Sequence, residues 1–119
     1  MIIAVDIDDT LTNTFSYLQP CVAEFFKVSK NYLIKNEISY CNLPPEWKKR
    51  ELEFCKAYFD KVIETTPFKR GASGAIKALK AAGHKIIIIT GRDERMYVDP
   101  YKTTEAELKN GDIIYDKLI

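Results

Sequence analysis

The chain has 119 residues, of which 46% are hydrophobic and 29% charged, and its formal net charge is +1. This composition is typical of one globular domain with a hydrophobic core, and the balanced charge disfavours a nucleic-acid polymer as partner. The three cysteines lack metal-like spacing, and no secretory signal is recognisable, so we expect reduced thiols and a cytoplasmic location. The longest apolar run, residues 86–89, is too short to cross a membrane.

The most informative stretch is residues 2–12, with the sequence IIAVDIDDTLT. Its apolar, β-branched start predicts a buried strand of a parallel sheet over about residues 2–6. Asp6, Asp8 and Asp9 then fall at the carboxyl end of that strand, where open α/β sheets bind ligands. A turn needs only one aspartate. We therefore interpret the cluster as a phosphate site in which Mg²⁺ offsets the repulsion between carboxylates.

Helical spacing of apolar residues follows this strand. The pattern from Phe15 to Phe26 predicts a helix, and Pro20 within it indicates that the helix either kinks there or begins nearby. A shorter helix is expected within residues 29–38.

The longest predicted helix covers residues 47–64, and Pro45 is well placed to open this region. Its wide apolar face consists of Leu52, Cys55, Phe59 and Val62, flanked by Phe54 and Tyr58. Such a face needs partners on two sides, so we expect a helical subdomain over residues 14–66. Aromatic residues such as Trp47 and Phe54 could line a pocket for a nucleobase, but the favoured interpretation is that they form the core of this subdomain.

The second half has the pattern of a parallel sheet. A helix is predicted over residues 72–82, stopped by Gly83, and residues 85–90 predict a second buried strand. A helix and a strand that follow an earlier strand indicate a βαβ unit.

Shorter elements are predicted towards the end of the chain. Asp99-Pro100 marks a turn, and Thr104 and Glu107 have the spacing of a capping box that begins a short helix. Asn110-Gly111 would end that helix, and residues 112–115 read as a third strand.

Together these elements predict an α/β fold, with an incomplete Rossmann-like parallel sheet of three strands and a helical cap inserted after the first strand. The core would comprise residues 1–13 and 67–119, and the cap would comprise residues 14–66.

Polar residues end both of the long predicted strands, and adjacent parallel strands would bring these ends together. Asp6 is the candidate nucleophile, because a carboxylate can attack a phosphoryl group and form an aspartyl-phosphate. Asp8 is the candidate general acid and base. Mg²⁺ held by Asp6 and Asp8 would neutralise charge on the phosphate. The candidate phosphate- or substrate-binding residues are Thr10, Thr90, Gly91 and Arg92.

The motif Asp6-x-Asp8-x-Thr10 after an apolar strand, with Thr90 ending a later one, resembles the haloacid-dehalogenase-like phosphohydrolases. The stretches DIDDTLTNTF, TPFKRGASGAIKALKAAGHKIIIITGR and DPYKTTEAEL are similar to the cytosolic 5'(3')-deoxyribonucleotidase-like group. The resemblance covers nearly the whole chain. It implies that Asp6 is the nucleophile, Asp8 the general acid and base, and Thr90 a ligand of the phosphoryl group.

The resemblance also implies a lysine, and acidic residues after a fourth strand, that are not found in this context before Ile119. We therefore expect the chain to lack the C-terminal part of the core. Its first strand would then be an exposed edge, and a homo-oligomer could form through it.

Three functions stay open. The leading one is a Mg²⁺-dependent phosphomonoester hydrolase of 5'-nucleotidase type, acting on a small-molecule phosphate monoester such as a nucleotide. The alternative is a non-catalytic truncated fragment or remnant of such an enzyme that binds phosphate or Mg²⁺ weakly. A receiver-like phosphoacceptor domain is disfavoured by the long insertion between Asp8 and Thr90. The residues do not fix the substrate.

Overall fold

The computed structural model describes residues 1–119. Its centre is a parallel sheet of three strands, β1 (Ile2–Val5), β2 (Lys85–Ile88) and β3 (Lys117–Leu118), in the order β1-β2-β3. The predicted α/β class with a Rossmann-like parallel sheet is confirmed. The strand β1 pairs only with β2, so it forms one edge of the sheet.

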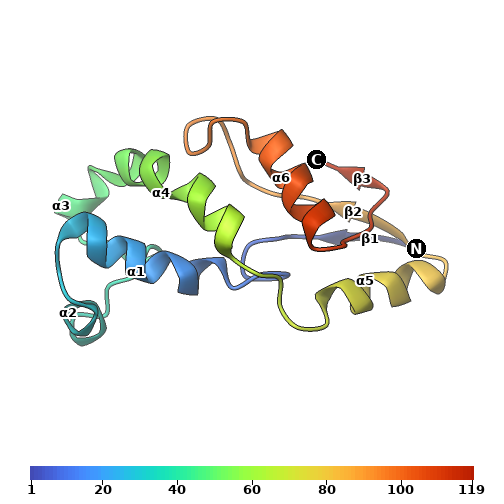
Figure 1. Cartoon of the computed structure of the whole chain (residues 1–119), viewed down its shortest axis with the longest axis horizontal. Helices are drawn as coiled ribbons and strands as arrows, with labels where there is room; N and C mark the ends of the chain where they lie inside the picture. The colour runs from blue at the N-terminus through green and yellow to red at the C-terminus, as the bar shows by residue number, and fades with distance from the viewer.

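Six helices accompany the sheet. Their bounds are α1 Thr14–Phe26, α2 Lys30–Lys35, α3 Pro45–Lys48, α4 Glu51–Thr65, α5 Ala72–Ala81 and α6 Pro100–Asn110. In Figure 1, α1 to α4 gather at one end of the elongated molecule, and α5 and α6 lie beside the sheet at the other end. None of the helices has the length and apolar character needed to span a bilayer.

The helices α5 and α6 pack against the sheet. Ile86 and Ile88 of β2 are buried in one cluster with Ile76 of α5 and Leu108 of α6. We call this cluster the sheet core. Side chains alternate along a strand, so Lys85 and Ile87 of β2 face the other way, and neither of them is buried.

A second cluster, the helical core, is built by α1, α2 and α4. Phe54 is fully buried at the centre of this cluster. The centroid of its ring lies 5.5 Å from that of Phe25 and 5.2 Å from that of Tyr58. The ring of Trp47 stacks on Phe26 at 4.3 Å. These aromatic residues therefore pack on one another, as the favoured interpretation predicts. The proposed boundaries between cap and core stay a prediction.

Two helices begin as the sequence suggests. The helix α1 starts at Thr14 and continues through Pro20, so the alternative of a later start does not apply. The Ser29 side chain caps α2 by accepting a hydrogen bond from the Tyr32 amide at 3.0 Å.

The prediction of a single helix over residues 47–64 is wrong at its N-terminal end. Pro45 opens the short helix α3, which contains Trp47, and the chain turns before α4 begins. The apolar spacing predicts Leu52 on the buried stripe, but Leu52 is exposed, because α4 turns Phe54 and its neighbours towards α1 instead.

The predicted capping box is also wrong. The helix α6 begins at Pro100, and the Asp99 carboxylate caps it by accepting a hydrogen bond from the Lys102 amide at 3.2 Å. Thr104 and Glu107 therefore lie inside the helix, where both are buried.

The third strand lies later than predicted. Residues 112–115 form no strand, because Asp112 adopts a left-handed conformation with φ of 55° and redirects the chain. Ile113 enters the sheet core, and the Asp116 carboxylate accepts a hydrogen bond from the Ile86 amide at 2.7 Å. Pairing with β2 then begins at Lys117.

Candidate active site

A tight loop follows β1 and carries the candidate catalytic aspartates. Its three successive amides from Thr10 to Thr12 all donate to the Ile7 carbonyl, at 3.1, 2.8 and 3.2 Å. Asp9 has φ of 61°, which aspartate tolerates better than most residues. Its carboxylate accepts a hydrogen bond from the Phe15 amide at 3.1 Å, at the start of α1. The loop is thus fixed both by its own backbone and by α1.

Arg92, which follows β2, holds the Asp8 carboxylate from the side. Its Nη2 donates to Asp8 Oδ1 at 2.9 Å, and its Nε donates to Oδ2 at 3.2 Å. Its Nη1 donates to Glu107 Oε1 at 2.8 Å and to Thr104 Oγ1 at 3.0 Å. We call Asp8, Arg92 and Glu107 the charge cluster, and it joins β1, β2 and α6.

The charge cluster is largely removed from water. The Arg92 side chain is 2% exposed, that of Glu107 5% and that of Asp8 21%. One guanidinium faces two carboxylates, so with all groups ionised the cluster carries one net negative charge. This excess must be offset by a nearby donor, by a cation or by protonation of a carboxylate.

Burial and pairing act in opposite directions on these groups. Burial lowers the pKa of Arg92, but the hydrogen bonds and charges of Asp8 and Glu107 outweigh it and raise that pKa overall. Burial raises the pKa of Glu107 above its ordinary value, and the pairing with Arg92 counteracts only part of this shift. Glu107 is thus the member of the cluster for which burial favours the protonated form.

Two threonines complete the surroundings of Asp8. The Thr14 hydroxyl donates to Asp8 Oδ1 at 2.7 Å, and it shares a hydrogen bond of 2.6 Å with the Thr12 hydroxyl. Both threonines are buried. Asp8 therefore accepts hydrogen bonds on both oxygens from Arg92 and Thr14.

Asp6 differs from Asp8 in being exposed and nearly free. Its Oδ1 accepts one hydrogen bond, from the amide of the neighbouring Ile7 at 2.8 Å. No hydrogen bond occupies its other oxygen, which suits a nucleophile.

A cavity of about 280 Å³ lies between the helical core and the ends of β1 and β2. It is lined by Asp6, Asp8, Gly91 and Arg92 from the candidate site, and by Thr14, Phe15, Leu18, Tyr40, Phe59, Met96 and Tyr97. We call it the catalytic cavity. Four of the six residues predicted to form the site therefore surround one space.

The other two predicted residues lie apart from this cavity. Thr90 lines a neighbouring cavity of about 140 Å³, and its hydroxyl accepts a hydrogen bond from the Arg92 amide at 3.4 Å. Thr10 is exposed and lines neither cavity. Their proposed contacts with phosphate stay predictions.

The Asp6 carboxylate is better suited to bind Mg²⁺ than the Asp8 carboxylate. Mg²⁺ is commonly held by one or two carboxylates, substrate phosphate and waters, and the exposed Asp6 carboxylate can serve in this way. Asp8 is engaged by Arg92, so the metal would have to compete with the guanidinium for it. No group of three or more His, Cys, Asp or Glu side chains that could hold a metal is found.

Sequence reasoning missed four residues near the site. Glu107 is a member of the charge cluster, and Thr14 and Thr104 form hydrogen bonds with Asp8 and Arg92 of that cluster. Lys69 donates from Nζ to the Asp9 carbonyl at 3.0 Å. The only signal for Thr104 and Glu107 was that they share one face of a helix. Lys69 lies in a linker and carries no periodic pattern.

Comparison with known proteins identifies the fold of this chain. No protein-family model matches the sequence, and no curated protein matches it. The structure is similar to the crystal structure of a predicted phosphatase from Clostridium acetobutylicum, with a TM-score of 0.66 and 16% sequence identity. The match covers 99% of this chain and 59% of that chain, so this chain spans about three fifths of that protein's length. The likeness establishes a shared Rossmann-like α/β fold.

Proposed function

We propose that the chain is a phosphomonoester hydrolase in which Asp6 is the nucleophile. The observation that carries the proposal is the position of Asp6: a free, exposed carboxylate at the carboxyl end of β1, facing a cavity together with Gly91 at the end of β2. Open α/β sheets place ligands at this edge. The motif from Asp6 to Thr10 and the fold shared with a predicted phosphatase support the same reaction class.

The reaction would proceed in two displacements at phosphorus. An Asp6 oxygen forms a bond to phosphorus, the ester P–O bond breaks, and the leaving oxygen takes a proton from Asp8. Water then gives a proton to Asp8 and forms a bond to phosphorus while the bond between phosphorus and the Asp6 oxygen breaks, which releases inorganic phosphate and restores the Asp6 carboxylate. Mg²⁺, when bound at Asp6, would offset the negative charges of the nucleophile and the phosphate.

The hydrogen bonds of Asp8 favour its role in the second displacement, in which it accepts a proton from water. Its oxygens accept hydrogen bonds from Arg92 and Thr14, so they are oriented as acceptors. Arg92 binds both oxygens, so donating a proton to the leaving group requires that Arg92 release one of them during the cycle. Arg92 is therefore a positioning residue whose movement accompanies catalysis.

The aromatic residues that line the catalytic cavity favour a nucleoside monophosphate as the substrate. Phe15, Tyr40, Phe59 and Tyr97 line the catalytic cavity, and aromatic rings stack well on planar bases. The cavity volume of about 280 Å³ lies near the lower end for small-molecule sites, so a monophosphate suits it better than a larger phosphate ester.

The test is phosphate release from a panel of nucleoside monophosphates and sugar phosphates, with and without Mg²⁺. Asp6→Asn should abolish release, because the nucleophilic oxygen is lost while the shape is kept. Asp9→Asn is the matched control: it removes the same charge from the same loop but leaves an oxygen for the Phe15 amide. Equal activity of the Asp6→Asn variant and the parent protein would remove Asp6 from the mechanism.

A second candidate is a non-catalytic chain that binds phosphate or Mg²⁺ weakly. The engagement of Asp8 by Arg92 favours it, because a fixed ion pair could hold the general acid and base in an inactive state. A folded protein that binds phosphate in an Asp6-dependent manner, yet releases none from any ester, would establish this alternative.

A further inference from the structure

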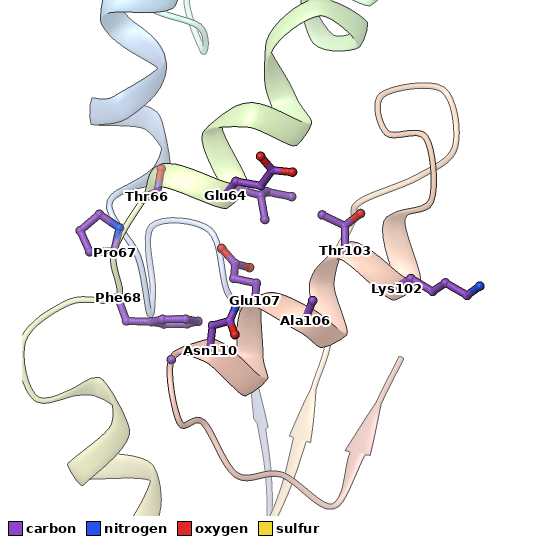
Figure 2. A pocket seen from close by; sticks show the side chains of 11 residues that line it. Glu64, Thr66, Pro67, Phe68, Lys102, Thr103, Ala106, Glu107 and Asn110 are labelled. Atoms are coloured by element: carbon purple, nitrogen blue, oxygen red, sulfur yellow. The ribbon is translucent and has the colours of Figure 1, made fainter.

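A second cavity lies beside Glu107, the member of the charge cluster that does not line the catalytic cavity. Its volume is about 560 Å³, within the range of small-molecule sites. The end of α4 and the linker after it form one wall, and α6 forms the other (Figure 2). We call it the α4–α6 cavity. It contains neither Asp6 nor Gly91, so it is separate from the catalytic cavity.

Two residues that line this cavity each have a buried polar side-chain atom without a hydrogen-bond partner. Glu107 Oε1 is bound by Arg92, but Oε2 is unpaired, and so is the Thr66 hydroxyl. The Glu107 side chain is 5% exposed and Thr66 is 6% exposed. In Figure 2 the Glu107 carboxyl group points from α6 towards Thr66 and the end of α4. Buried polar atoms of this kind normally have a partner.

The shape and charge of the cavity restrict what could bind. The Phe68 ring forms one side, and Figure 2 shows it reaching from the linker towards Asn110 and Glu107. With all groups ionised, the charge cluster behind Glu107 carries one negative charge in excess, and Glu64 adds another carboxylate at the wall. Lys102 is the one cationic residue of the lining. A flat ring can stack on Phe68, and N–H donors are favoured over anions.

We propose that the α4–α6 cavity binds a flat aromatic ligand that carries an amidine or amino group, with the ring against Phe68 and an N–H donated to Glu107 Oε2. A second polar atom of the ligand would pair with the Thr66 hydroxyl. The amino edge of a nucleobase has this chemistry. The proposal does not rest on the proposed hydrolase function, because none of the ligand's contacts involves Asp6.

The test is titration of the isotopically labelled protein with benzamidine, followed by amide chemical shifts, with benzoate as the matched anion. Benzamidine should bind saturably with a dissociation constant on the order of 1 mM or tighter. The shifts should centre on Ala106 and Gly111, and benzoate should cause none there. Adenosine and cytidine, added in separate titrations, should compete if the natural ligand is a nucleobase. Their failure to displace benzamidine would exclude the nucleobase source while leaving the aromatic amidine site in place.

Three variants separate binding from folding. Thr66→Val removes an unpaired buried hydroxyl, so the free protein should melt at a higher temperature while benzamidine binds about fivefold more weakly. Glu107→Gln should weaken binding by about tenfold or more, since a charge-assisted hydrogen bond is lost. Glu105→Gln, on the same helix but outside the cavity, is the matched charge control and should bind like the parent protein.

Equal shifts with benzamidine and benzoate would overturn the proposal. So would undiminished binding in Thr66→Val, a variant that is expected to fold even if Glu107→Gln does not.

Discussion

Arg92 binds the carboxylate of Asp8 with two hydrogen bonds, Nη2–Oδ1 at 2.9 Å and Nε–Oδ2 at 3.2 Å, while its third nitrogen reaches Glu107 on α6. One side chain therefore connects the loop after β1 with the helix after β2. This link sets the position of the proposed general acid and base, and it connects Asp8, which lines the catalytic cavity, with Glu107, which lines the α4–α6 cavity.

Replacing Arg92 by methionine should destabilise the protein strongly. Two buried carboxylates, Asp8 and Glu107, would lose their shared cation, and breaking a buried pair in this way costs about 3–5 kcal/mol. Urea unfolding measures the loss. Arg95→Met is the control, because Arg95 and its partner Asp93 form an ion pair at the surface, and that variant should unfold close to the parent. Similar midpoints for the two variants would show that the charge cluster contributes little.

Glu107 should give the protein a recognisable pH dependence. Burial raises its pKa in the folded state, whereas in the unfolded state it takes the ordinary value of about 4.3. Between the two values the folded state binds more protons, so this group's stabilising contribution is present at low pH and is lost as pH rises through the folded pKa.

The pH effect is isolated by comparison with Glu107→Gln. The free energy of unfolding of the parent, measured from about pH 4 to about pH 8, should decrease relative to that of the variant as pH rises. Parallel pH profiles would mean that Glu107 does not titrate differently in the two states.

Two glycines offer a matched test of packing. A methyl group on Gly111 would overlap the Phe68 ring, so Gly111→Ala should cost about 1–3 kcal/mol. Gly74 lies inside α5 with open space around it, so Gly74→Ala should stabilise by about 0.5–1 kcal/mol through higher helix propensity. Thermal unfolding should therefore shift in opposite directions. A neutral Gly111→Ala would show that Phe68 moves aside freely.

The open edge of β1 should promote self-association. The carbonyls of Met1 and Val5 accept hydrogen bonds from β2, so the alternate residue Ala4 directs its backbone groups to the unpaired edge. Light scattering after size-exclusion chromatography should show a concentration-dependent dimer. Ala4→Pro removes the edge N–H and should shift the equilibrium to monomer. A parent protein that is monomeric at every concentration would contradict this prediction.

Much of the fold can be predicted from the sequence because its strands and helices have strong local signals. The β-branched runs before Asp6 and before Thr90 predict strands, and the residues between them have helical spacing. Both strands form, but the expectation that the first is buried is wrong, because β1 lies at an edge of the sheet and none of its residues is buried. The end of β1 also locates Asp6 and Asp8, since three carboxylates directly after an apolar strand are more than a turn requires.

What the sequence could not show depends on contacts between distant residues. The spacing of Thr104 and Glu107 fits a capping box and one face of a helix equally well, and the start of α6 at Pro100 together with the contacts to Arg92 decides between them. The run after Asp112 looks like a strand, but a left-handed turn and the Asp116 contact with Ile86 set the true register of β3. The local propensity of the residues predicts neither the position of Thr104 and Glu107 within α6 nor the register of β3.

The central claim, that Asp6 forms a covalent bond to phosphorus, is tested most directly by trapping the aspartyl-phosphate. The protein would be mixed with a nucleoside monophosphate and Mg²⁺, quenched, and reduced with borohydride, which converts an aspartyl-phosphate to homoserine. Mass spectrometry of the N-terminal peptide should then find homoserine at position 6 in the parent and none in Asp6→Asn. Phosphate release without any modified residue at position 6 would contradict the account.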